Sequence, residues 1–303
     1  MASQEQIRDQ ITNQIIEALE EGKTVPWRQP WIGIKNGGRP ANVVSNNPYR
    51  GINPLLLSLH QQRHGFHSKW YGTFKQWDNL GGRVMRRPDD VLPGAWGCGI
   101  IYYCPISKTV TDPITGEESE EKYPLLKTYS IFCIDQVEGE HLDHLRAKDE
   151  GPLNDEFVDF EPAERAIAAT EADIRYTGDR AFYNTGGDYL QVPPKNRYFR
   201  PSEFYSTCFH ELAHWSEKRT EWKGNYAEGE LRAEIAAAYM LAELGVPPSS
   251  DMANHQAYVK GWLQALRNDN RFIFKASTAA SKAADFILSF SRQPEPELVD
   301  VPF

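Results

Sequence analysis

The run FHELAHWSEK, at residues 209–218, constrains the fold of this 303-residue chain more than any other stretch. It holds His210 and His214 four residues apart, and Glu211 directly follows the first histidine. Residues at positions i and i+4 share one face of an α-helix, so the spacing predicts a helix that presents both imidazoles together. Apolar neighbours predict that this helix is largely buried, where two unliganded histidines would be costly.

This spacing is typical of a zinc site. Both imidazoles can reach one tetrahedral ion at ~2.0–2.1 Å, while the intervening Glu211 lies near a metal-bound water without binding the metal. A catalytic zinc needs a third protein ligand. We expect Glu234 to be that ligand, because it lies among alanines on a second helix predicted at 228–244. Glu230, one turn earlier, is expected to hydrogen-bond a ligand histidine. The predicted cofactor is one divalent metal, either zinc or another transition metal such as manganese.

The same motif predicts a candidate chemistry. In H-E-x-x-H peptidases the glutamate is the general base, so Glu211 is the candidate catalytic residue. His255 and Tyr258 are weaker candidates for the donor to an oxyanion. The strand expected at 188–192 could bind an extended peptide by edge pairing. Metal ligands alone identify no substrate, so peptide hydrolysis stays an open question at this point.

Hydrophobic periodicity and charge divide the chain into two domains and a linker. Residues 1–135 read as an α+β domain, 136–161 as an acidic linker, 162–290 as a mainly helical domain with a small edge sheet, and 291–303 as a loose tail. Helices are expected at 3–21, 53–65, 203–217, 228–244, 251–268 and 272–290, and strands at 97–109 and 125–134. The predicted fold class is therefore α+β.

Charge is distributed unevenly along the chain. Residues 1–110 carry 13 Lys and Arg against 8 Asp and Glu, whereas residues 111–303 carry 20 against 34. The first third is thus suited to meet a polyanion, and the remainder is expected to repel one.

Bases and aromatic residues alternate in the first domain. The candidate DNA-binding residues are Trp27, Arg28, Trp31, Tyr49, Arg50, Lys69, Trp70, Tyr71, Phe74, Lys75, Trp77, Arg83, Arg86 and Arg87. Bases contact phosphates and aromatic faces stack on unpaired nucleobases, so the pattern favours single-stranded DNA over duplex. Taken alone, the pattern favours core packing, because aromatic residues are more often core than stacking platforms.

Other features indicate a cytoplasmic protein without a membrane partner. No apolar run approaches the ~20 residues of a membrane span. The polar N-terminal segment lacks the continuous apolar core of a signal peptide. Cys98, Cys104, Cys133 and Cys208 are scattered, which is typical of buried, reduced thiols.

Two groups of motifs together resemble the ArdC antirestriction family. The C-terminal runs AFYNTGGDYLQVP, EFYSTCFHELAHWSE and YAEGELRAEIAAAYM resemble its zincin-like metallopeptidase domain. The N-terminal runs PYRGINPLLL, KWYGTFKQWDNLGGRV and LKTYSIFCIDQVEG resemble its single-stranded-DNA-binding domain. The resemblance implies His210, His214 and Glu234 as metal ligands and Glu211 as the catalytic glutamate. Two departures stand out: MRRPDD replaces a Gly/Lys-rich turn, and Gly229 separates two acidic residues.

The resemblance also implies a function. Proteins of this family are plasmid-encoded and protect incoming DNA from host restriction, often while it is single-stranded during conjugation. We therefore expect an antirestriction protein whose partners are single-stranded DNA and either a protein substrate or the host restriction machinery. Two alternatives remain: a DNA-associated zinc endopeptidase that acts on a DNA-bound protein, and a non-enzymatic DNA-binding protein with a structural metal.

Overall fold

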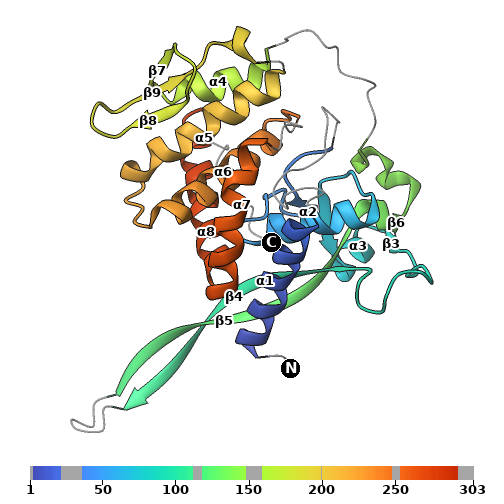
Figure 1. Ribbon diagram of the computed structural model, residues 1–303. Coiled ribbons are helices and arrows are strands. Elements are labelled where there is room, and N and C mark those ends of the chain that lie inside the picture. Colours follow the sequence, from blue (N-terminus) through green and yellow to red (C-terminus); the bar gives the residue numbers. More distant parts are fainter. Residues whose placement is uncertain are drawn as a thin grey trace, which may run out of the picture.

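The computed structural model describes residues 3–21, 36–111, 118–147, 159–198, 200–247 and 253–292. An N-terminal part built around a sheet lies beside a mainly helical C-terminal part, and a two-stranded arm projects away from both (Figure 1). The predicted α+β class is confirmed. Among the helices of the described residues, none combines the length and the apolar character needed to cross a membrane.

A four-stranded sheet organises the N-terminal part. Its order is β1 (Ala41–Asn42), β2 (Trp70–Thr73), β5 (Glu118–Cys133) and β4 (Cys98–Thr111). Helix α2 (Asn53–His64) packs against β4, and the short α3 (Phe74–Asn79) follows β2 directly. Pro54 in the first turn of α2 and left-handed Gly65 at its end account for the bounds of this helix.

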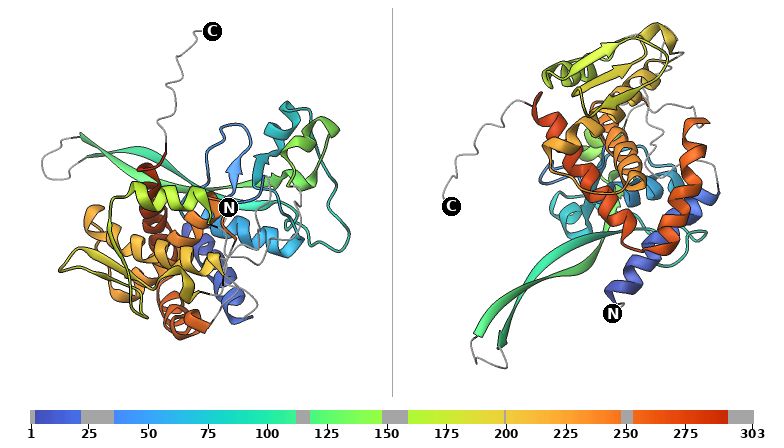
Figure 2. Two further views of the ribbon diagram at one scale, coloured as in Figure 1. Left: turned by 90° about the horizontal axis from the view of Figure 1, so that it is seen from above. Right: turned by 60° about the vertical axis from the view of Figure 1, so that its left-hand side comes forward.

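The arm is the continuation of the β4–β5 pair. The two strands stay antiparallel from Cys98 opposite Ile131 to Thr111 opposite Glu118. Strand β2 pairs only with Ile131–Cys133 of β5, so most of the hairpin extends beyond the sheet as a free ribbon (Figures 1 and 2). The strands predicted at 97–109 and 125–134 are confirmed, and part of the polar stretch expected between them belongs to β5.

The segment predicted as a linker begins inside folded structure. After the short helix η1 (Ile134–Gln136), strand β6 (Val137–Glu138) pairs with β3 (Arg83–Val84), and helix η2 (Glu140–Leu145) follows. Arg146 donates to the carbonyl of Ile134 at 2.7 Å and so fixes this return of the chain. The folded N-terminal part therefore includes residues of the predicted linker, because local pairing outweighs the acidic composition of the segment.

Four long helices and a small sheet form the C-terminal part. Helices α5 (Pro201–Arg219), α6 (Tyr226–Glu243) and α8 (Phe272–Ser289) pack on one another, with α4 (Glu161–Ala169) against α5 and α7 (Ala253–Asn268) against α6 and α8. The sheet order is β7 (Asp173–Tyr176), β9 (Tyr189–Val192) and β8 (Phe182–Asn184), and η3 (Lys195–Arg197) follows it. Strand β9 is paired on both sides, so the expectation of an open edge at 188–192 is wrong.

The two parts meet through a polar junction. Helix α1 (Gln4–Glu20) packs along α7, and Thr12 donates to the carbonyl of Asn270 at 3.1 Å (Figures 1 and 2). The Arg39 guanidinium is buried and donates to Glu243 of α6 at 3.0 Å. Tyr239 of α6 donates to the carbonyl of Gly51 at 2.8 Å. Polar and charged groups of one part are thus satisfied by the other, which fixes the relative placement of the two parts.

Candidate metal centre

Helices α5 and α6 hold the candidate site between them. Helix α5 begins with Pro201 in its first turn, and α6 begins with a capping box in which Asn225 and Glu228 satisfy each other's backbone N–H groups. The apolar face of α5 is buried, as expected. Its other face presents His210 and His214, whose side chains are each 18% exposed.

The imidazoles of the motif point at a common centre. Nε2 of His210 and Nε2 of His214 lie 3.2 Å apart. Two ligands held at 2.0–2.1 Å by a tetrahedral ion lie about 3.3 Å from each other, so this separation fits one shared metal. The Glu230 carboxylate completes the group, 3.5 Å from Nε2 of His210 and 3.8 Å from Nε2 of His214. The ligand atoms of these three residues all lie within 4.8 Å of one another.

Glu234, the expected third ligand, occupies a different position. Its carboxylate lies 3.4 Å from Nδ1 of His210, on the side of the ring that faces away from His214. This is the position from which a carboxylate orients a ligand imidazole. The geometry therefore groups the Glu230 carboxylate with both histidines and places the Glu234 carboxylate beside Nδ1 of His210.

A second orienting carboxylate was missed from the sequence. Oε1 of Glu217 lies 2.8 Å from Nδ1 of His214, so that ring can donate to Glu217 and turn Nε2 toward Glu230. Glu217 in turn lies 3.8 Å from the buried Arg232 guanidinium. The signal was present, since Glu217 follows His214 by three residues and a helix brings such pairs together.

Electrostatics at the centre favour a positive charge. Burial alone would lower the pKa of His210, but contacts with Glu230 and Glu234 outweigh it and raise this pKa well above its ordinary value. Burial would raise the pKa of Glu230, yet the neighbouring histidines hold it below its usual range. A half-buried pair of imidazoles facing carboxylates is the environment that a divalent cation would complete.

Glu211 has the environment expected of a general base. It is buried, and burial raises the pKa of its carboxyl group while His210 and His214 oppose that shift. The backbone of Tyr183 in β8 hydrogen-bonds to it, so the small sheet fixes this side chain against α5. The alternative donors cannot be placed, because the side chains of His255 and Tyr258 lie outside those described.

The predicted DNA-binding residues fall into distinct environments. Trp27, Arg28 and Trp31 lie outside the described residues. Tyr71 and Trp77 are completely buried. In this fold they are core residues, and a nucleobase has no access to their rings.

The remaining candidates lie nearer the surface. Tyr49 and Trp70 are half-buried, Lys69 lies 4.8 Å from the Trp70 ring centre, and Arg50 pairs with Asp285 of α8 at 3.1 Å. Arg87 is half-buried and donates to the carbonyl of Val91. The exposed members are Arg50, Phe74, Lys75, Arg83 and Arg86. Cys98, Cys133 and Cys208 are buried free thiols, as expected.

Comparison with protein families assigns both parts of the chain. Residues 5–132 match the family described as the N-terminal domain of anti-restriction factor ArdC. Residues 161–279 match the family described as zincin-like metallopeptidase. The two matches cover the sheet-containing part and the helical part in that order.

Individual relatives extend this finding. The metal-free crystal structure of antirestriction protein ArdC from plasmid R388 is 34% identical, with a TM-score of 0.73 over 94% of this chain and 97% of that one. Its Mn(II)-bound structure gives a TM-score of 0.68 at 31% identity, over 95% and 99% of the two chains. The protein y4eC of Sinorhizobium fredii is 28% identical over 93% of this chain and 91% of its own length. The DNA primase TraC of Escherichia coli is 31% identical over 94% of this chain, which spans only 27% of that primase.

Proposed function

This chain belongs to the ArdC family of antirestriction proteins, and from that premise we propose that it binds incoming DNA as a single strand and protects it from host restriction. One observation carries the proposal: the likeness to ArdC of plasmid R388 runs through both parts of the chain and covers 97% of that protein. We propose the cytoplasm as the place of action, because restriction enzymes meet incoming DNA there.

Two features support DNA as the partner. Residues 1–110 carry 13 Lys and Arg against 8 Asp and Glu, and their exposed cations Lys75, Arg83 and Arg86 can contact phosphates. The β4–β5 arm adds exposed Tyr102 and Tyr129, whose rings can stack on unpaired bases. Stacking needs an open base face, so these aromatics favour a single strand over a duplex.

We further propose that His210, His214 and Glu230 hold a divalent metal, with Glu234 and Glu217 orienting the two imidazoles. Zinc is the first choice for two imidazoles and one carboxylate, and manganese is the alternative. When bound, the metal would supply Lewis acidity toward a carbonyl or a water. Glu211 would accept and hold a proton beside it, since burial raises the pKa of this carboxyl group.

A second candidate function is peptide hydrolysis on a DNA-bound protein. The specific observation in its favour is that Glu211, both histidines and the Glu230 carboxylate lie together in one centre. A metal with a purely structural role would not require a buried glutamate beside the histidines. Glu211→Gln separates the two, because it removes the proton acceptor and leaves the ligands in place.

The experiment that tests DNA binding compares two probes of equal length and sequence, one single-stranded and one duplex. Fluorescence anisotropy of the full chain should show tighter binding to the single strand, and affinity should fall with added salt at a slope of about 0.7 per phosphate contact. Equal affinity for the two probes, or an affinity that does not respond to salt, would contradict the proposal.

A further inference from the structure

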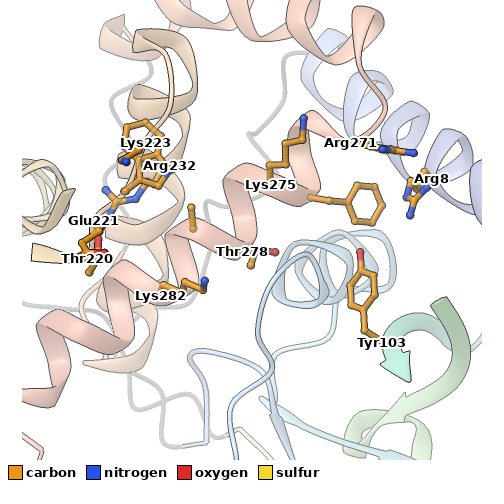
Figure 3. A pocket seen from close by; sticks show the side chains of 13 residues that line it. Arg8, Tyr103, Thr220, Glu221, Lys223, Arg232, Arg271, Lys275, Thr278 and Lys282 are labelled. Atoms are coloured by element: carbon orange, nitrogen blue, oxygen red, sulfur yellow. Dashed lines mark hydrogen bonds between the residues drawn. The ribbon is translucent and has the colours of Figure 1, made fainter. Parts of the chain in front are cut away.

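A basic groove lies where the two parts of the molecule meet. It encloses about 610 Å³ between α1, the root of β4, α8 and the loop that joins α5 to α6. Figure 3 shows Arg8, Arg271 and Tyr103 gathered at one end, Lys223 and Arg232 at the other, and Lys282 between them. Six cations line it in all: Arg8, Lys223, Arg232, Arg271, Lys275 and Lys282.

The groove is positively charged, although the segment that supplies most of its lining residues carries a net negative charge. All of these cations except Arg8 come from residues 111–303, the part with 20 Lys and Arg against 34 Asp and Glu. Among the described residues that line the groove, Glu221 is the one carboxylate. The expectation that this part would repel a polyanion therefore does not hold for this surface.

Most of the positive charge is left unneutralised. Lys275 pairs with Asp269 at 3.0 Å, and the buried Arg232 donates to the Ala213 carbonyl and to Ser216. For the other four cations, the part of the chain that the structure describes offers no carboxylate within ion-pair distance. Like charges gathered in one groove repel each other, and an anionic ligand relieves that repulsion.

The cations on α8 form a row rather than a single anion pocket. Arg271, Lys275 and Lys282 follow each other at four and seven residues, so they share one helix face. Their positions along the axis differ by about 6 Å and about 10 Å. A row of this kind matches a chain of repeated negative charges better than one compact anion.

Aromatic rings lie at both ends of the row. Tyr103 is 46% exposed at the root of the arm, and Trp222 is half-buried on the loop after α5. Cations that track a backbone, together with rings that accept unpaired bases, are the elements of a single-strand binding surface. Duplex DNA offers phosphates but no free base faces.

We propose that this groove holds the backbone of single-stranded nucleic acid, so that the DNA-contacting surface crosses from the N-terminal part onto α8. The inference rests on the DNA binding proposed above and gives it a location. The buried Arg232 lines one end of the groove and lies 3.8 Å from Glu217, which contacts His214, so the groove approaches the metal centre where α5 joins α6.

The test uses the full chain and a fluorescein-labelled oligo(dT) of about 20 nucleotides, longer than the site of one binding domain. The variant Arg271→Gln/Lys282→Gln removes two exposed groove cations for which no ion pair is described. The control, Arg165→Gln/Arg180→Gln, removes two exposed cations from α4 and the β7–β8 loop, away from α8 (Figure 1); of the two, Arg165 pairs with Glu161 at 2.6 Å on the exposed face of α4. Both variants should unfold at the wild-type temperature.

Two lost phosphate contacts lower the slope of log affinity against log salt by about 1.4, which corresponds to about 25-fold weaker binding at 0.1 M salt than wild type. The control should bind within about twofold of wild type. Lys282→Glu alone gives a second measurement and should weaken binding by about fivefold or more.

If wild type binds oligo(dT) and both groove variants bind it with the same affinity and the same salt dependence, the groove is not the binding surface, although DNA binding itself stands. Absence of binding by the wild type would overturn the proposed function and this inference together.

Discussion

Replacing Glu230 and Glu234 one at a time tests the assignment of the metal ligands. The structure places the Glu230 carboxylate near the Nε2 atoms of both histidines, and the Glu234 carboxylate near Nδ1 of His210. Glu230→Gln should therefore remove a metal ligand, whereas Glu234→Gln should only loosen the orientation of the His210 imidazole. Glu211→Gln is the control within the same site, because that carboxylate is not among the grouped ligand atoms.

The magnitudes follow from linkage. A metal present at 100 times its dissociation constant stabilises the folded state by about 2.7 kcal/mol. Loss of an orienting partner weakens metal affinity by roughly 10- to 100-fold. At the same metal concentration, the metal should therefore stabilise Glu234→Gln by only about 0.4–1.4 kcal/mol. Glu230→Gln should keep almost none, and Glu211→Gln should keep nearly all of it.

The assay is denaturant unfolding of each variant with and without zinc or manganese, at one fixed metal concentration. The metal-dependent difference in the free energy of unfolding gives the stabilisation, so any effect of the substitution on the metal-free fold cancels. If Glu230→Gln keeps the full stabilisation while Glu234→Gln loses it, Glu234 is the ligand and the geometric argument fails.

Three further outcomes are expected. Burial lowers the pKa of His60 to about 4, below the 6.5 of an exposed histidine. The stability contributed by the neutral imidazole is therefore fully present above pH 6.5 and is lost as pH falls toward 4. Between pH 7 and 5, the free energy of unfolding in urea should fall by about 2 kcal/mol more for wild type than for His60→Gln. In Gly38→Ala the new Cβ would lie 2.5 Å from the carbonyl oxygen of Ala242. This variant should lower the free energy of unfolding by about 1–3 kcal/mol more than Gly65→Ala, whose backbone also has a positive φ but whose Cβ would meet nothing within 4 Å. An equal loss of stability in the two variants would refute the close contact. Glu211→Gln should bind oligo(dT) as wild type does and lose any peptide cleavage, and a loss of DNA binding would show that the site and the strand interact.

Local patterns predicted most of the secondary structure. The helix expected at 228–244 is found at Tyr226–Glu243, and the one expected at 272–290 at Phe272–Ser289. Their bounds are set by caps and breakers within a few residues, which a sequence displays directly. The H-E-x-x-H helix was predictable for the same reason, because its ligand spacing is a property of one helix.

The choice between two glutamates was not local. Glu230 and Glu234 are one turn apart on the same face of α6, so both satisfy the periodicity. Which of them meets Nε2 depends on how far α6 is shifted along α5, and that shift is set by tertiary packing. The sequence predicted both residues as part of the site, and the Glu230→Gln and Glu234→Gln variants decide which of them binds the metal.

Aromatic residues posed the same difficulty in the N-terminal part. Trp77 and Tyr71 belong to a run rich in bases, yet both are buried, and Trp77 donates to the Phe132 carbonyl at 2.9 Å. A stacking surface and a core use the same side chains, and only the fold distinguishes them. The basic groove was hidden for a related reason, since net charge over a long segment averages over faces that the fold separates.

The most direct test of the account is protection of DNA in cells. Unmodified plasmid DNA would be conjugated into a restricting host that carries either wild-type protein or Glu211→Gln, with folding and oligo(dT) binding of the variant verified first. If protection depends on DNA binding, Glu211→Gln should raise the yield of transconjugants as much as wild type does. A folded, DNA-binding Glu211→Gln protein that gives no protection would contradict the account and identify the metal centre as a working enzyme.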